Sequence, residues 1–273
     1  MSLSRPANFP FLKLPWLCIK CVIQNSDLFD MQYVDYWGGQ YLLSYTSGDK
    51  LDALKIGIEF MIDVFKCSVK RVFVDGHKLS ELFGLGINSV GKLHVRDPGP
   101  VVITDLKNLL KTIEVTDSFV FDVQIPKDYF CDRQIFKCRQ VLFDGVHSAD
   151  LVTFEILGQL DVPQLSFWFH RFSVEDIVSY ITHWFNSNNR KLEHVHFEFD
   201  NPVSLENIKI DHLNPMLFDE KRRNRCPLVG EWKGKDMSSG MDILRQDGLL
   251  ATFFVDSTSV IFYVWHKRFP NAV

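Results

Sequence analysis

The chain has 273 residues, 46% of them hydrophobic and 23% charged, so it can bury a sizeable core without help from disulfide bonds. The formal net charge of −4 and the pI near 6.1 argue against a general nucleic-acid-binding protein. No apolar run reaches the length of a membrane span, and six scattered cysteines without an N-x-Ser/Thr acceptor favour a reducing compartment. We therefore expect an intracellular protein, cytoplasmic or nuclear, with no membrane or nucleic-acid partner.

The first 65 residues contain two predicted helices separated by a strand-like segment. Residues 9–30, F-P-F-L-K-L-P-W-L-C-I-K-C-V-I-Q-N-S-D-L-F-D, predict a strongly apolar helix that begins near Pro15. Such a helix either packs on the end of the following domain or binds a partner. Residues 31–42 are aromatic and strand-like, and residues 51–65 carry the apolar stripe of a second helix.

Six short segments then repeat the pattern apolar-x-x-apolar-x-apolar, with spacings on the order of 20 to 30 residues, the range of leucine-rich repeats. An amphipathic helix separates most of them. We predict an α/β fold in which strand–helix units form an irregular, leucine-rich-repeat-like solenoid with parallel strands. The alternative is an open doubly wound sheet, which usually carries a glycine-rich phosphate turn that is absent here. The central strand residues are Val72, Leu93, Phe121, Val141, Leu165 and Val195.

The clearest strand–helix–strand unit spans residues 162–199. Ser173 precedes Asp176 by three residues, which is the spacing of a capping box, and the apolar residues that follow recur at helical spacing. The run from Asn186 to Asn189 should end this helix. Thr104 and Ser148 are the expected N-caps of two earlier helices.

The sequence pattern changes after residue 213 and predicts a different architecture for the carboxyl-terminal part of the chain. Residues 214–240 are rich in charge, Gly, Pro and Ser and suggest a loop with at most one short strand. The pair Asp247-Gly248 is a hairpin signal between two apolar runs, and a third run follows. We expect an antiparallel meander over residues 241–267 that caps the repeats. The residues expected to cover the last repeat are Phe253, Val255, Ile261 and Tyr263 or Trp265.

Two groups of residues have spacings that suit metal binding. Cys18 and Cys21 have redox or zinc spacing but lie within a predicted helix and lack two further ligands. Alternation places His194, His196 and Glu198 on one strand face, where they could hold a metal or could simply be exposed polar residues. No phosphate-binding loop, nucleophile elbow or His-Glu-x-x-His motif occurs. We expect a protein that is not an enzyme and has no cofactor, with a metal-dependent enzyme as the third alternative.

Several blocks resemble one protein family. F-P-F-L-K-L-P-W-L-C-I-K-C-V-I looks like the opening of the F-box found at the start of nematode F-box proteins. F-K-C-S-V-K-R-V-F-V-D-G (65–76), I-F-K-C-R-Q-V-L-F-D-G (135–145), H-W-F-N-S-N-N-R-K-L-E (183–193) and the tail 241–255 resemble the type 2 F-box-associated domain. The resemblance implies a partial F-box over 9–30, limited to its first helix, an associated repeat domain over 31–240 and the meander over 241–267.

The resemblance also implies a function. F-box proteins are the substrate-recognition subunits of SCF-type ubiquitin ligases and bind a Skp-type adaptor. Beyond residue 30 the strand-like segment stands where the family has a second and third helix, so we expect weakened adaptor binding. The alternative is a repeat-domain protein-binding module that is uncoupled from the ligase. The residues that match the adaptor-binding positions of the first helix are Leu14, Pro15, Ile19 and Ile23.

A target-binding surface is expected on the strand faces that point away from the core. Residues that flank the inward-pointing ones mix aromatic and charged side chains, as binding surfaces do. Trp168, with His196 on the next strand, is the hypothesised centre, although a neighbouring loop or the tail could equally cover Trp168. The selected target-binding residues are Phe73, His94, Leu142, Trp168, His194 and His196.

Overall fold

A computed structural model describes residues 33–37, 40–44, 69–83, 85–96, 101–123, 136–144, 152, 154–168, 170–203, 208–219 and 236–266. Strands β1 (Tyr33–Trp37) and β2 (Gln40–Ser44) form an antiparallel pair, which confirms the strand-like prediction for this segment. The predicted helices over 9–30 and 51–65 and the expected cap Ser148 lie outside the described residues.

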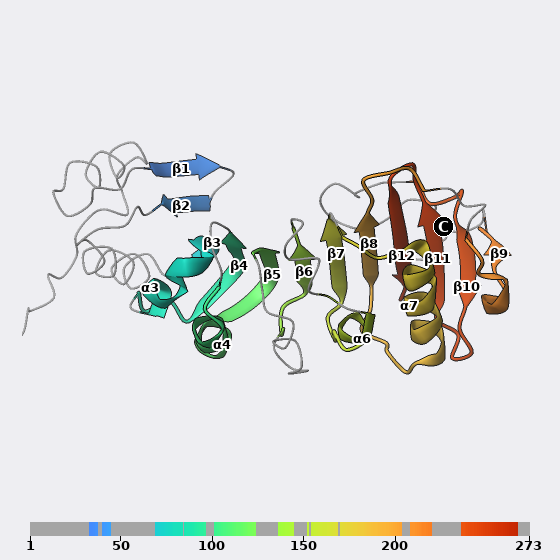
Figure 1. Ribbon diagram of the computed structural model, residues 1–273, viewed down its shortest axis with the longest axis horizontal. Helices are drawn as coiled ribbons and strands as arrows, with labels where there is room; N and C mark the ends of the chain where they lie inside the picture. The colour runs from blue at the N-terminus through green and yellow to red at the C-terminus, as the bar shows by residue number, and fades with distance from the viewer. Residues whose placement is uncertain are drawn as a thin grey trace, which may run out of the picture.

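The other ten described strands form one open mixed sheet (Figure 1). Six parallel strands lie side by side in chain order and are followed by four antiparallel ones. The parallel strands are β3 (Val69–Asp75), β4 (Ser89–Arg96), β5 (Glu114–Asp122), β6 (Gln140–Phe143), β7 (Gln164–Trp168) and β8 (His194–Glu198). The sheet continues through β12 (Ser259–Trp265), β11 (Leu250–Val255), β10 (Met241–Leu244) and β9 (Met216–Leu217).

The described helices are short and few. They are α3 (Leu79–Phe83), α4 (Ile103–Thr112), α6 (Phe154–Leu157) and α7 (Val174–Asn186), with 3-10 turns η2 (Gly76–Lys78) and η5 (Asp211–Leu213). Buried residues of all four α-helices belong to one hydrophobic cluster with one face of the sheet. We call this the helix face and the opposite one the second face. Figure 1 shows α7 in front of β12 and β11.

The predicted architecture is confirmed only in part. Parallel strands in chain order with helices between them agree with stacked strand–helix units, and the order has no reversal of the kind that defines a doubly wound sheet. A leucine-rich-repeat solenoid is not confirmed. The connections are unequal, the described helices are few, and four antiparallel strands extend the sheet, so the fold is an open mixed sheet.

The helix face carries the strand residues that the repeat pattern singles out, with one correction. The row across the parallel strands runs Val72, Leu93, Phe119, Val141, Leu165 and Val195. Phe119, rather than the expected Phe121, therefore occupies the third place. Because the difference is two residues, both side chains remain on the same face, and the hydrophobic pattern alone could not separate the two registers.

A second row on the helix face is a ladder of stacked phenylalanines. Phe121, Phe143, Phe167 and Phe197 pair in register on four adjacent strands and are fully buried. Their ring centroids are 5.6, 5.0 and 5.2 Å apart with interplanar angles of 13°, 5° and 11°. These separations are close to the strand spacing of about 4.8 Å, so in-register pairing places each ring against the next.

Helix α7 begins as its sequence predicts. The backbone N–H of Asp176 donates to Ser173 Oγ at 3.1 Å, and the backbone N–H of Ser173 donates to Asp176 Oδ2 at 2.9 Å. The apolar stripe packs inward, and the helix ends at Asn186. The prediction for Thr104 is wrong, because the N-cap of α4 is Val102, two residues earlier, and it forms no side-chain cap. The segment 101–103 is Val-Val-Ile, so packing of apolar residues fixes that end.

The carboxyl-terminal meander is confirmed, with a hairpin turn at which Gly248 has φ +85°. It extends the sheet instead of covering its end, because β12 pairs antiparallel with β8. Phe253 and Val255 pack on the helix face, whereas Ile261 and Trp265 belong to a separate cluster on the second face. Alternation along β11 and β12 therefore divides the expected covering residues between the two faces.

One buried arginine joins the meander to α7. Arg245 is 3% exposed, and its Nη1 donates to the backbone oxygens of Trp184 and Asn189 at 3.2 and 2.8 Å. Its Nε and Nη2 both donate to the Asp247 carboxylate at 2.9 Å. The guanidinium carbon lies 4.6 Å from the Trp184 ring centroid. Because the charge is paired and hydrogen-bonded, it can be buried where it holds the carboxyl end of α7 in place.

We predict that Phe167→Ala lowers the free energy of unfolding by about 3–5 kcal/mol, because it removes a fully buried ring from the ladder. Phe73→Ala, the same substitution at a side chain that is 38% exposed, should cost less than about 1 kcal/mol. Urea denaturation of both variants measures the difference. Equal losses would contradict the assignment of the ladder as the core.

Candidate functional site

The six expected target-binding residues all lie on the second face of the sheet. Strand register places Phe73 beside His94 on β3 and β4, and it aligns Leu142 on β6 with His196 on β8 through the intervening strands. His194 and Trp168 lie in the adjacent rows of the same face. Alternation along the strands thus predicted the shared face correctly. Target binding by these residues stays a prediction.

Among the six expected target-binding residues, solvent accessibility decreases from Phe73 on β3 to the histidines on β8. Phe73 is 38% exposed, whereas His196 is 1% exposed. His94, Leu142 and Trp168 are half-buried, and His194 is buried. Trp168 can therefore present part of its ring, but His196 beside it has almost no surface to offer a partner. The accessible part of the face lies over β3, β4 and β6.

Basic side chains surround the exposed aromatic residue. Phe73 lies 5.3 Å from the His94 ring, measured between centroids. The guanidinium carbons of Arg71 and Arg96 lie 5.9 and 5.4 Å from the Phe73 ring centroid, within cation–π range. Lys92 pairs with Arg71 in the strand register. We call Arg71, Phe73, Lys92, His94 and Arg96 the basic–aromatic patch.

The charges of the patch act on its titratable groups. Burial, followed by the charges of the neighbouring Lys92, Arg96 and Arg71, lowers the pKa of His94 to about 4. Burial and the Arg71 charge also lower the pKa of Lys92. His94 is therefore neutral at physiological pH. The positive charge of the patch comes from Arg71, Lys92 and Arg96.

Carboxylates offset this charge only in part. Asp75 lies 3.7 Å from Arg96 and 3.9 Å from Lys78, and burial raises the pKa of Asp144 near Lys92. Among the described residues, no carboxylate lies within ion-pair distance of Arg71 or Lys92. The patch therefore keeps cationic groups that can attract a negatively charged partner.

The histidine pair on β8 is buried. His196 Nε2 and Glu198 Oε2 are 3.1 Å apart, and Thr258 Oγ1 donates to Glu198 Oε1 at 2.9 Å. The His194 and His196 ring centroids are 6.3 Å apart. In the described part of the chain, no group of three His, Cys, Asp or Glu side chains is placed to hold a metal ion. His194 Nε2 is buried without a hydrogen-bond partner among the described residues, whereas the contacts of His196, Glu198 and Thr258 join β8 to the segment before β12.

The remaining predicted site residues lie outside the part of the chain that the structure describes. Leu14, Pro15, Ile19 and Ile23, expected to bind an adaptor, and the Cys18–Cys21 pair fall before residue 33. The structure also adds three residues to the selected set, because Arg71, Lys92 and Arg96 share the second face with Phe73 and His94. Alternation along the two consecutive strands predicts this shared face from the sequence.

Comparison with known proteins identifies one segment. Residues 134–197 match the family described as F-box associated. We call residues 134–197 the F-box associated segment. This segment contains β6, α6, β7, α7 and β8, and hence three of the four stacked phenylalanines. The segment thus supplies the last three parallel strands, which lie at the centre of the ten-stranded sheet.

Two uncharacterized proteins of Caenorhabditis elegans are also similar to the chain. One is 30% identical over 131 residues, which cover 45% of this chain and 30% of that protein. The other is 29% identical over 134 residues, which cover 46% of this chain and 31% of that protein. The matched region thus spans less than a third of either relative. No solved structure matches the chain, and no helix among the described residues is long and apolar enough to cross a membrane.

We predict that His194 makes stability depend on pH. Burial lowers its pKa to about 3 from the usual 6.5, so the unfolded chain takes up a proton at a higher pH than the folded chain. The stability contributed by the neutral imidazole is complete above 6.5 and decreases as the pH falls toward 3. His194→Gln should therefore reduce the loss of unfolding free energy between about pH 7 and about pH 5.

Urea denaturation at the two pH values measures this loss. The control is His183→Gln, because His183 is exposed on α7 and its replacement should leave the pH dependence as in the wild type. An unchanged pH dependence in His194→Gln would show that other groups cause the acid sensitivity.

Proposed function

We propose that this chain is a protein-interaction subunit that recognises a polypeptide target through the basic–aromatic patch. The proposal rests on Phe73, which is 38% exposed although it lies in a strand, with Arg71 and Arg96 beside its ring. Aromatic and arginine side chains are the residues that most often carry binding energy at protein interfaces. The F-box associated segment supports a substrate-recognition role, because that domain accompanies F-box proteins.

Charge complementarity specifies the target further. The chain has a net charge of −4, whereas the patch gathers three cations around one aromatic ring. A target segment with carboxylates next to an apolar residue would pair with the cations and cover Phe73. Such contacts steer association and select the partner, and salt weakens them.

The connection to ubiquitin ligases depends on residues before the sheet. In the proposed function, residues 9–30 contribute the first helix of an F-box, and a Skp-type adaptor binds it weakly. The second candidate is a protein-binding module that acts without the ligase. It is favoured by the antiparallel β1–β2 pair, which occupies residues where a complete F-box would continue as helices. Both candidates place the protein inside the cell and assign it no catalytic step.

We predict that Arg71→Glu combined with Lys92→Glu reduces target capture at least tenfold, because it reverses two charges of the patch. Affinity purification from cell extract with quantitative mass spectrometry measures the capture of each partner. The matched control is Lys111→Glu combined with Lys209→Glu, which makes the same charge change at exposed positions outside the patch.

Partners that bind through the patch should be retained by the control pair and lost at high salt. If every captured protein is lost equally with both pairs of substitutions, net charge and not the patch governs binding. If both pairs retain all partners, the patch is not the target site.

We predict weak binding of a Skp-type adaptor, because a standard interface buries roughly 800 Å² on each partner and one helix of this length supplies less. Titration calorimetry of the purified chain with the adaptor tests this prediction. Submicromolar affinity that is lost in the Leu14→Asp and Ile19→Asp double variant would contradict it and restore the complete ligase role.

A further inference from the structure

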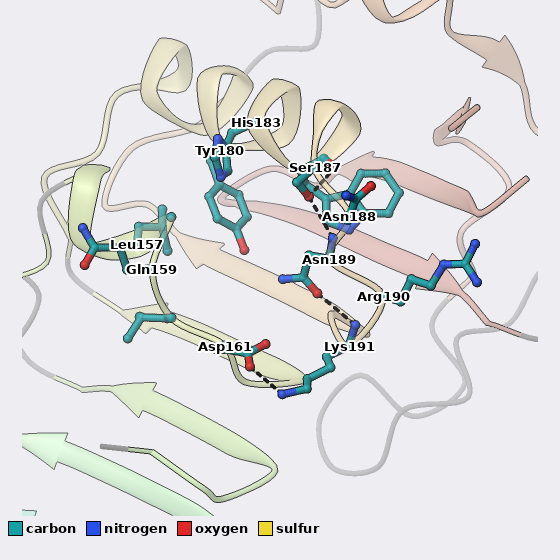
Figure 2. Close-up of a pocket in the computed structure, with 13 residues that line it drawn as sticks. Leu157, Gln159, Asp161, Tyr180, His183, Ser187, Asn188, Asn189, Arg190 and Lys191 are labelled. Carbon is teal, nitrogen blue, oxygen red and sulfur yellow. Dashed lines mark hydrogen bonds and ion pairs between the residues drawn. The ribbon is translucent and has the colours of Figure 1, made fainter. Parts of the chain in front are cut away.

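A cavity of about 460 Å³ lies on the helix side of the sheet, within the F-box associated segment. It is enclosed by the carboxyl end of α7, the loop that follows it and the segment leading from α6 into β7 (Figure 2). Its volume is in the range of about 300–1,000 Å³ that small-ligand sites occupy. Leu157, Leu160 and Trp184 supply apolar surface, and polar side chains supply the rest.

The Tyr180 hydroxyl is an unused hydrogen-bond donor in this cavity. Tyr180 is only 4% exposed, yet no described residue forms a hydrogen bond with its hydroxyl. Figure 2 shows the side chain reaching from α7 into the cavity with the hydroxyl at its tip. Burial raises the pKa of Tyr180 above its usual value, so the group remains protonated. The hydroxyl can therefore donate to a ligand or a water molecule that enters the cavity.

The Asn189 side chain offers a second donor with a fixed direction. Its Oδ1 accepts hydrogen bonds from the backbone N–H groups of Lys191 and Leu192 at 2.8 and 3.1 Å. The amide is thereby oriented so that Nδ2 faces the other way, toward the space below the Tyr180 hydroxyl (Figure 2). The Asn189 backbone oxygen is held by Arg245 at 2.8 Å. The donor is therefore built into a supported loop.

The charged residues of the wall favour an anionic ligand. Arg190 and Lys191 line the cavity, and each is paired with a carboxylate, Arg190 with Asp247 and Lys191 with Asp161. Arg245 shares the Asp247 carboxylate, so three cations stand against two carboxylates around the cavity and the local field is positive. A planar group with two acceptor oxygens and a negative charge would satisfy both free donors in this field.

We propose that this cavity binds a carboxylate on a short apolar or aromatic stem, with Tyr180 Oη and Asn189 Nδ2 as its hydrogen-bond donors. The stem packs against Leu157, Leu160 and Trp184. The carboxylate belongs either to the free carboxyl terminus of a polypeptide or to a small organic acid. This site is independent of the target-binding role of the basic–aromatic patch, which lies on the opposite face of the sheet.

The test uses four probes on the full chain, with binding followed by nuclear magnetic resonance titration. They are N-acetylphenylalanine, its amide, a hexapeptide that ends in phenylalanine, and the same hexapeptide with an amidated end. Each acid should bind at least tenfold more tightly than its amide. Tighter binding by the peptide acid would identify a chain end as the ligand, and tighter binding by N-acetylphenylalanine would identify a small acid.

Two substitutions assign the donors. Tyr180→Phe removes only the hydroxyl, and Asn189→Asp keeps the acceptor oxygen but replaces the donor nitrogen with a repelling oxygen. Each should raise the Kd of the acids at least tenfold. Tyr263→Phe and Asn214→Asp make the same changes outside the cavity lining and should leave the Kd unchanged.

The proposal is overturned if acid and amide bind the wild-type chain equally, or if neither acid binds at about 10 mM. It is also overturned if both cavity variants bind like the wild type. Because the first comparison uses only the unmodified chain, it remains decisive where a variant fails to fold.

Discussion

The in-register stacking of phenylalanines on four adjacent parallel strands is the interaction on which the rest of the described sheet depends. The rings are stacked at about the strand spacing, so a slip of β6 or β7 would break two ring contacts at once. The ladder lies beneath the helices, and three of its four rings belong to the F-box associated segment. The segment that matches the family therefore contains residues that form the core of the sheet. The features available for recognition lie on the surfaces that this scaffold exposes.

Arg245 connects the antiparallel end of the sheet to the parallel part. Its hydrogen bonds reach the last turn of α7 and the loop after it, while the Asp247 carboxylate balances its charge. The guanidinium holds the pKa of Asp247 well below its usual range, so this pair stays ionised down to acidic pH. The meander therefore does more than close a sheet edge, because it also fixes the loop that forms one wall of the cavity.

The two faces of the sheet offer different chemistry. On the helix side, the cavity presents two directed donors in a positive field, which suits a small acidic group. On the second face, the basic–aromatic patch gathers cations around an exposed aromatic ring and suits a polypeptide segment, while the histidines of β8 are buried nearby. A single chain could thus hold a target at the patch and a separate carboxylate at the cavity without competition between them.

The sequence by itself determined the features that depend on neighbouring residues. The capping box at Ser173 and Asp176, the hairpin at Asp247-Gly248, the inward strand pattern and the shared face of Phe73, His94 and Leu142 all follow from local spacing. Only the tertiary structure decided features set by strand register and by the packing of distant segments. It moved the third row position to Phe119, buried His194 and His196, and brought Arg245 to α7. A two-residue slip preserves the hydrophobic pattern, and the burial of a polar side chain depends on what distant segments place over it, so neither could be deduced from local sequence.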